Sequence, residues 1–131
     1  MRVFLDTNVL ASALMGHGLC RDLLARITVG HEVIVGEPLL DELRRVLIEK
    51  FRVPPEVWRR VELKLREFEQ APASSLSVSA VIPDPDDIPI MACALAAGVD
   101  VIVTGDKALV EIGKIDAIPI LTPRQLWQWL G

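Results

Sequence analysis

The sequence is poor in the residues that form disulfides or bind zinc. It has two cysteines, Cys20 and Cys93, which are far apart and form no CxxC pair. Its two histidines, His17 and His31, form no cluster. This content excludes a disulfide-stabilised scaffold and gives no zinc-ligand pattern, so we expect two free thiols in a reducing cytoplasm.

Long apolar runs and a surplus of positive charge are also absent. No stretch approaches the roughly 18 consecutive apolar residues that a membrane span requires, and the first apolar run is broken by Asp6. We therefore expect a cytoplasmic protein that does not associate with membranes. The net charge is −4, so any surface for nucleic acid would have to be local. Glycine-rich nucleotide-binding loops of the GxGxxG and GxxxxGKS/T types do not occur.

The sequence does contain an alternation of short β-branched runs and longer helical ones. Strands are predicted over 2–5, 32–36, 99–105 and 116–121, with a weaker candidate over 76–82. Helices are predicted over 8–14, 19–29, 38–51, 55–70, 88–97, 106–112 and 123–130. This order predicts a single α/β domain over residues 1–131, with a parallel sheet of four to five strands covered by helices on both faces. We expect Pro119 to place its strand at a sheet edge, and the polar stretch 69–79 to be a loop.

Carboxylates follow two of the predicted strands. Asp6 comes directly after the strand over 2–5, and Asp106 comes directly after the strand over 99–105. The carboxyl ends of parallel strands lie along one edge of a sheet. These two side chains should therefore face each other across a crevice at that edge.

Further acids belong to the predicted helices. Asp84, Asp86 and Asp87 precede a helix whose amino end should lie at the same edge of the sheet, although Asp86 or Asp87 could serve instead as a helix N-cap. Glu42 lies on the apolar flank of the helix over 38–51. From there it could reach the same crevice or form an ion pair with an arginine.

No basic residue is apparent among these carboxylates. Their mutual repulsion would raise their pKa values and destabilise the fold locally, unless a cation lies between them. Oxygen ligands suit Mg²⁺ or Mn²⁺, and metals held by acidic residues in this way hydrolyse phosphodiesters. Such a cation would also allow a net-acidic protein to act on RNA.

Four segments of the chain, "FLDTNVLASAL", "LLDELRRVL", "DPDDIPIMACALAAGVDVIVTGD" and "ILTPRQLW", together resemble a PIN domain. The resemblance covers essentially the whole chain and is strongest to the VapC-like toxins of bacterial and archaeal toxin–antitoxin systems. It implies a three-layer α/β/α sandwich and a metal-dependent endoribonuclease. It also implies a small antitoxin partner and a homodimer.

The resemblance further implies which residues form the site. The family's acidic quartet corresponds to Asp6, Glu42, Asp87 and Asp106, as catalytic residues and as ligands of Mg²⁺ or Mn²⁺. Asp86 stays an alternative to Asp87, because Ile88 and Pro89 replace the acid and lysine that often follow in the family, and the proline could shift the helix start.

Two neighbours of the quartet match supporting positions of the family. Asn8 and Thr104 are expected to support the site by hydrogen bonding or to contact substrate. Thr7 and Asn8 could equally be turn-forming residues that cap the next helix.

Three other functions are alternatives to the nuclease. A phosphatase of the haloacid-dehalogenase type needs an aspartate where this chain has Asn8, and a receiver domain needs a pair of acids after the first strand. The main alternative is a PIN scaffold that binds protein or RNA with weak or no catalysis.

Two other stretches have both a structural and a functional interpretation. From Arg44 to Arg66 there are eight basic and three acidic residues, which could hold RNA or an acidic antitoxin segment. A solvated helical face with pairs such as Glu56–Arg60 and Glu62–Arg66 is the simpler interpretation. The glycine-containing stretch 15–20 is either a plain connector or a border of the crevice.

Overall fold

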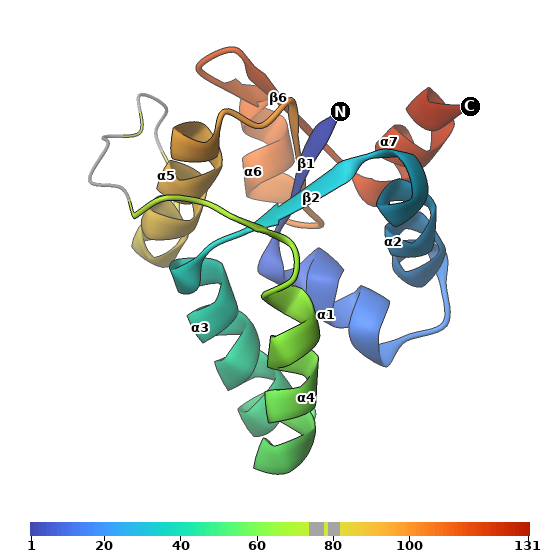
Figure 1. The fold of residues 1–131 in the computed structure, drawn as a ribbon. Coiled ribbons are helices and arrows are strands. Elements are labelled where there is room, and N and C mark those ends of the chain that lie inside the picture. Colours follow the sequence, from blue (N-terminus) through green and yellow to red (C-terminus); the bar gives the residue numbers. More distant parts are fainter. Residues whose placement is uncertain (74–77, 79–81) are drawn as a thin grey trace.

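A six-stranded sheet in the order β3-β2-β1-β4-β6-β5 forms the centre of the molecule (Figure 1). The computed structural model describes residues 1–73, 78 and 82–131. The strands are β1 (Arg2–Leu5), β2 (Glu32–Val35), β3 (Glu69–Gln70), β4 (Val101–Val103), β5 (Lys114–Ile115) and β6 (Ile118–Leu121). The pairs from β3 to β6 are parallel, and β5 runs antiparallel to β6.

Helices connect these strands and cover both faces of the sheet. They are α1 (Thr7–Met15), α2 (Leu19–Gly30), α3 (Glu37–Arg45), α4 (Pro55–Leu65), α5 (Ile88–Ala97), α6 (Lys107–Ile112) and α7 (Pro123–Leu130). Val3, Phe4 and Leu5 point alternately to the two faces of β1, and each is at most 1% exposed. Burial on both faces confirms the predicted α/β/α sandwich. The weak strand predicted over 76–82 lies largely outside the described residues.

The register of the central strands brings their carboxyl ends to one level. Val3 is opposite Val101, and Leu5 is opposite Val103. The backbone N–H of Asp6 donates to the carbonyl oxygen of Val103 over 2.8 Å, which extends the pairing by one residue. Asp6 and the start of the loop after β4 therefore lie side by side.

The helix predicted over 38–51 has two parts in the structure. After α3, the chain continues as a π-helix, η1 (Val46–Lys50), in which the N–H of Phe51 donates to the carbonyl oxygen of Val46 over 3.2 Å. The next residue, Arg52, has a φ of 58°, in the left-handed region. The chain then turns into α4.

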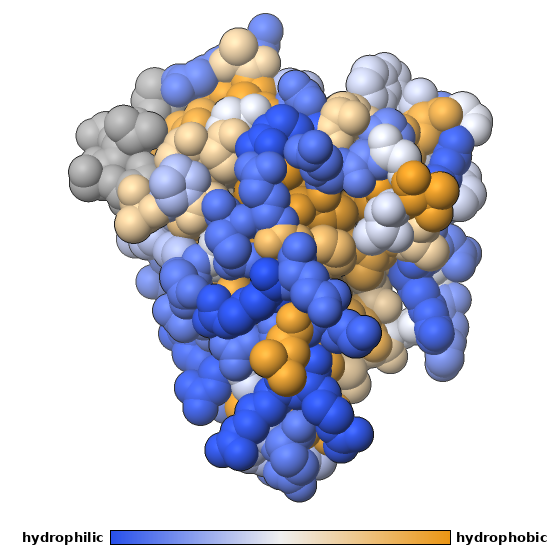
Figure 2. Space-filling view, viewed as in Figure 1, coloured by the Kyte–Doolittle hydropathy of each residue, from blue (hydrophilic) through white to orange (hydrophobic). Residues whose placement is uncertain are grey.

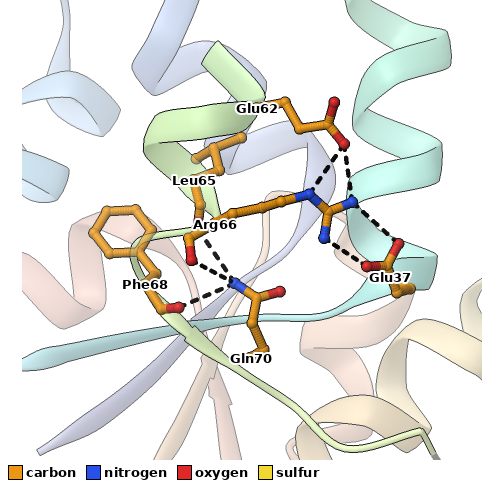
Figure 3. A network of polar contacts seen from close by, with 6 residues as sticks. All are labelled: Glu37, Glu62, Leu65, Arg66, Phe68 and Gln70. Atoms are coloured by element: carbon orange, nitrogen blue, oxygen red, sulfur yellow. Dashed lines mark hydrogen bonds and ion pairs between the residues drawn. The ribbon is translucent and has the colours of Figure 1, made fainter. Parts of the chain in front are cut away.

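The helix predicted over 55–70 is shorter than expected. α4 ends at Leu65, and Glu69 and Gln70 form the edge strand β3 beside Ile34 and Val35 of β2. The side-chain amide of Gln70 donates to carbonyl oxygens at and just after the end of α4. The shortest of these hydrogen bonds is the one to Phe68, at 3.0 Å (Figure 3). The helix therefore ends where the sheet and this amide supply other hydrogen-bond partners.

The expectation that the strand with Pro119 lies at a sheet edge is wrong. β6 has β4 on one side and β5 on the other, with Pro119 opposite Lys114. Pro119 is tolerated because β5 contributes only two residues, and the next N–H, that of Ile120, donates to the carbonyl oxygen of Gly113 over 2.9 Å.

The basic stretch from Arg44 to Arg66 is largely solvent-exposed, and Figure 2 shows hydrophilic surface over this end of the molecule. Arg66 forms ion pairs with Glu62 at 2.9 Å and with Glu37 of α3 at 2.6 Å (Figure 3). The predicted Glu62–Arg66 pair is thus present. In the part of the chain that the structure describes, no helix has the length and apolar character needed to cross a membrane.

Candidate active site

An acidic cleft of about 300 Å³ opens at the carboxyl edge of the sheet. Five carboxylates line it, and they come from four separate parts of the chain: Asp6, Glu42, Asp84, Asp87 and Asp106. The remaining lining residues are Thr7, Asn8, Ala11, Ser12, Val46, Lys50 and Phe51. The structure therefore brings together all four members of the quartet expected from the sequence.

Asp6 is the most buried of these acids, with 5% of its surface exposed. It is the N-cap of α1, and its Oδ1 accepts a hydrogen bond of 2.8 Å from the N–H of Thr7. Its Oδ2 accepts one of 2.7 Å from the hydroxyl of the fully buried Thr104. The cap of this helix is therefore Asp6, and the expectation that Thr7 or Asn8 caps it is wrong.

Thr104 connects the two strand-end aspartates. Its hydroxyl oxygen accepts a hydrogen bond of 3.1 Å from the N–H of Asp106 while its proton is donated to Asp6. The Oδ1 of Asp106 accepts from the N–H groups of Ala108 and Leu109, which makes Asp106 the N-cap of α6. Hydrogen bonds from the protein thus fix the orientation of both aspartates, which side chains that act together in a site require.

Asn8 stands at the rim of this arrangement. It is exposed in the first turn of α1, and its Oδ1 accepts a hydrogen bond of 3.3 Å from the N–H of Gly105. The bond ties the start of α1 to the loop after β4, and it leaves the amide N–H groups of Asn8 at the mouth of the cleft.

Glu42 projects into the cleft from the middle of α3 and is partly buried. Burial and the nearby charge of Asp6 raise the pKa of its carboxyl group, whereas Thr7 and Arg45 lower it by smaller amounts. No ion pair between Glu42 and an arginine is present among the described residues. The alternative in which an arginine neutralises Glu42 is therefore not supported.

The acids before α5 have different positions. Asp84 caps the short helix η2 (Pro85–Asp87) by accepting a hydrogen bond of 3.0 Å from the N–H of Asp86. Asp84 and Asp87 line the cleft, and Asp86 is exposed outside it. Asp87 sits at the N-cap position of α5 without a side-chain capping bond. The sequence analysis names Asp84 with Asp86 and Asp87 but gives it no place in the quartet, whereas the structure places it in the lining of the cleft.

The electrostatics of the cleft are those of crowded like charges. Burial raises the pKa of Asp6, and the charge of Asp106 adds to this effect, although the hydrogen bonds from Thr104 and Thr7 oppose it. Burial, followed by the charges of Asp6 and Asp84, raises the pKa of Asp87 to about 7. Lys50 is the single basic residue among the described residues that line the cleft. The protein itself therefore supplies little of the positive charge that these carboxylates need.

The donor set fits a hard divalent cation. It consists of carboxylate oxygens with no sulfur or imidazole group, which is the chemistry that Mg²⁺ and Mn²⁺ prefer. The buried hydroxyl of Thr7 is close enough to Glu42 to lower the pKa of that carboxyl group, although it makes no hydrogen bond of regular geometry there. Within the described ranges, no three His, Cys, Asp or Glu side chains lie close enough together to form a metal site.

Comparison with known proteins gave one family and a set of related folds. The family model for the PIN domain matches residues 2–108. One solved structure with a similar fold is VapBC2 from Rickettsia felis, crystallised with a DNA fragment from the promoter of its genes. It has 17% sequence identity and a TM-score of 0.66, and the match covers 93% of this chain and 98% of that chain. No curated protein matched the sequence. Because the family model covers most of the chain, including strands β1 to β4 and every acid of the cleft, this chain belongs to the PIN domain family.

Proposed function

We propose that this protein is a Mg²⁺- or Mn²⁺-dependent endoribonuclease and the toxin of a toxin–antitoxin pair. Membership of the PIN family supports a nuclease at the level of the family. The observation that carries the finer proposal is the cleft itself, in which carboxylates from four parts of the chain converge with Lys50 as the one basic neighbour among the described residues. Repulsion between these carboxylates and their partial burial destabilise the folded protein, and a bound cation would offset both effects.

In this proposal Asp6, Asp87 and Asp106 hold the metal ion. A bound Mg²⁺ or Mn²⁺ would supply an activated water and neutralise charge on the scissile phosphate. Asp6 and Asp106 are suited to this role because hydrogen bonds already fix both carboxylates. Burial and the charges of Asp6 and Asp84 raise the pKa of Asp87 to about 7, so a neighbouring cation would stabilise its ionised form.

The other polar groups would act on water and substrate. The carboxyl group of Glu42 would ligate the metal or orient the attacking water, since it faces Asp6 across the cleft and Thr7 lies beside it. Thr104 would keep Asp6 and Asp106 in register through its two hydrogen bonds. The amide of Asn8 would donate to a phosphate oxygen at the mouth of the cleft.

The partner in this proposal is a small antitoxin protein, and the toxin forms a homodimer in the cytoplasm. The similarity in fold to VapBC2, which was crystallised on promoter DNA, supports a regulated pair of this kind. The rival function is a PIN scaffold that binds RNA or protein without cleaving it. One observation favours this rival: among the described residues, no three His, Cys, Asp or Glu side chains lie close enough together to hold a metal ion.

A matched pair of variants on α3 tests the proposed nuclease. Glu42→Gln should reduce cleavage of a fluorescent single-stranded RNA in Mn²⁺ by about a hundredfold, because it removes the carboxylate that handles water. Asp41→Asn, at the exposed neighbouring position, should cleave at the wild-type rate. Equal rates in the two variants, or no cleavage by the wild type, would favour the scaffold.

A further inference from the structure

The segment that joins α3 to α4 has an unusual backbone where it borders the acidic cleft. The π-helix η1 adds one residue per turn relative to an α-helix, and Arg52 directly after it is in the left-handed region with a φ of 58°. Residues other than glycine rarely adopt this conformation, and such strained positions concentrate at functional sites. This backbone brings Lys50 and Phe51 to the wall of the cleft.

Phe51 lines the acidic cleft and two further hollows. Together with Ser12 it lines an adjoining hollow of about 340 Å³. Phe51 is 43% exposed, so its side chain is accessible to a ligand. An aromatic ring at the boundary between two cavities can present a face to a ligand that occupies both.

The adjoining hollow is mainly apolar. Met15, Leu19 and Cys20 form its walls with Phe51, and Gly16 and Gly18 contribute backbone. Gly16 leaves no space for a side chain, because a Cβ there would lie 2.8 Å from the carbonyl oxygen of Ser12. The stretch 15–20 therefore borders this hollow, whereas none of its residues lines the acidic cleft itself.

We propose that Phe51 and this hollow form a nucleobase subsite, and that Lys50 contacts the phosphate between the bound base and the acidic cleft. The inference rests on the proposed nuclease function and adds to it how a single strand is held. A strand whose phosphate lies in the cleft must place an adjacent base nearby, and the hollow next to Phe51 shares Ser12 and Phe51 with the cleft as lining residues. An aromatic platform combined with a lysine is the usual means of binding single-stranded nucleic acid.

The charge of the cleft favours this occupant over a peptide. With a metal bound, the cleft would attract the phosphates of a single strand, and Lys50 adds a positive charge to its wall. The base then stacks on Phe51, and Met15 and Leu19 exclude water from its edges. Binding would be tolerant of sequence, because every base has a face that can stack.

The test uses two fluorescein-labelled probes, a 12-mer of adenylate RNA and a 12-mer with the same backbone but no bases. All proteins carry Glu42→Gln so that the probes stay intact, and binding in Mg²⁺ is followed by fluorescence anisotropy. Phe51→Ala should weaken binding of the adenylate probe about tenfold and leave the abasic probe unchanged, whereas Phe51→Tyr keeps wild-type affinity. Lys50→Ala should weaken both probes and reduce the salt dependence of log K by about one unit. Trp129→Ala, which removes another exposed aromatic ring, is the control and should change neither affinity.

The outcomes separate this inference from the function on which it rests. If the protein with intact Phe51 binds neither probe, the proposed nuclease function fails, and the subsite fails with it. If it binds and Phe51→Ala changes neither probe, or weakens both equally, the nucleobase subsite is wrong and the nuclease is untouched. If Phe51→Ala changes the affinity for neither probe, the hollow is free for a peptide segment of a protein partner. Melting temperatures of all variants establish that each is folded.

Discussion

Asp6→Asn should abolish RNA cleavage, with a loss of about a thousandfold or more, and should leave the protein folded. Asp6 is the most buried acid of the cleft, and an amide cannot replace the negative charge of its carboxylate. Its hydrogen bonds can largely be kept. The amide oxygen of an asparagine can still accept from the N–H of Thr7, and its nitrogen can donate to the hydroxyl oxygen of Thr104.

The stability of this variant distinguishes a functional charge from a structural one. Burial raises the pKa of Asp6, so its ionised form is unfavourable in the metal-free fold, and a neutral amide removes that cost. We expect a melting temperature equal to or above that of the metal-free wild type, measured by circular dichroism beside the cleavage assay. Asp41→Asn serves as the control for loss of an exposed charge. An Asp6→Asn protein that cleaves RNA at the wild-type rate would disprove the assigned role.

The second large effect is the combined dependence of stability on pH and metal. The metal-free protein should be most stable near pH 5 and should lose about 5 °C in melting temperature by pH 8. The folded protein keeps a proton on Asp87 up to a pKa of about 7, against an ordinary value of 3.8, and the pKa values of Asp6 and Glu42 are also raised. The unfolded chain releases these protons at lower pH. The folded state therefore binds more protons across this interval, and its stability falls as pH rises.

Other carboxylates do not cancel this trend within the interval. Arg66 lowers the pKa of Glu37, and Arg2 lowers that of Glu69. The stability that these two ion pairs contribute develops as the pH rises to the unfolded pKa of 4.5 and changes little above it, so it does not oppose the trend between pH 5 and pH 8. Mn²⁺ should reverse the loss, and by more at pH 8 than at pH 5, because only ionised carboxylates bind it. At a concentration of 100 times its dissociation constant, a ligand of the folded state adds about 2.7 kcal/mol.

A pair of variants separates the cleft from the rest of the surface. Asp87→Asn should flatten the pH profile of melting temperature and weaken the response to Mn²⁺. Asp86→Asn, one residue away but outside the cleft, should behave as the wild type. Stability that rises from pH 5 to pH 8 without metal would contradict the assignment of these raised pKa values.

Much of the site followed from the sequence because topology alone determines it. Asp6 and Asp106 end buried runs, and parallel strands place such ends on one edge of the sheet. Glu42 could be placed because its helix has a clear apolar face. Which of Asp86 and Asp87 lines the cleft could not be read from the sequence, since it depends on the single turn of η2.

The features that the sequence did not reveal are short or depend on tertiary contacts. β3 and β5 have two residues each, too few for any periodic pattern. The residues Val46–Lys50 continue the apolar pattern of α3, so that a π-helix cannot be told from an α-helix in advance. The position of Lys50 and Phe51 beside the acids follows from that one change in helical geometry.

The most direct measurement is the anomalous diffraction of Mn²⁺ in crystals of the wild-type protein soaked at pH 8. An anomalous peak in the cleft, in contact with carboxylate oxygens of Asp6, Asp87 and Asp106, is the predicted result. Two results would contradict the proposal that the cleft binds a metal ion. One is the absence of a peak at saturating Mn²⁺, and the other is an arginine or lysine side chain in the space between those carboxylates.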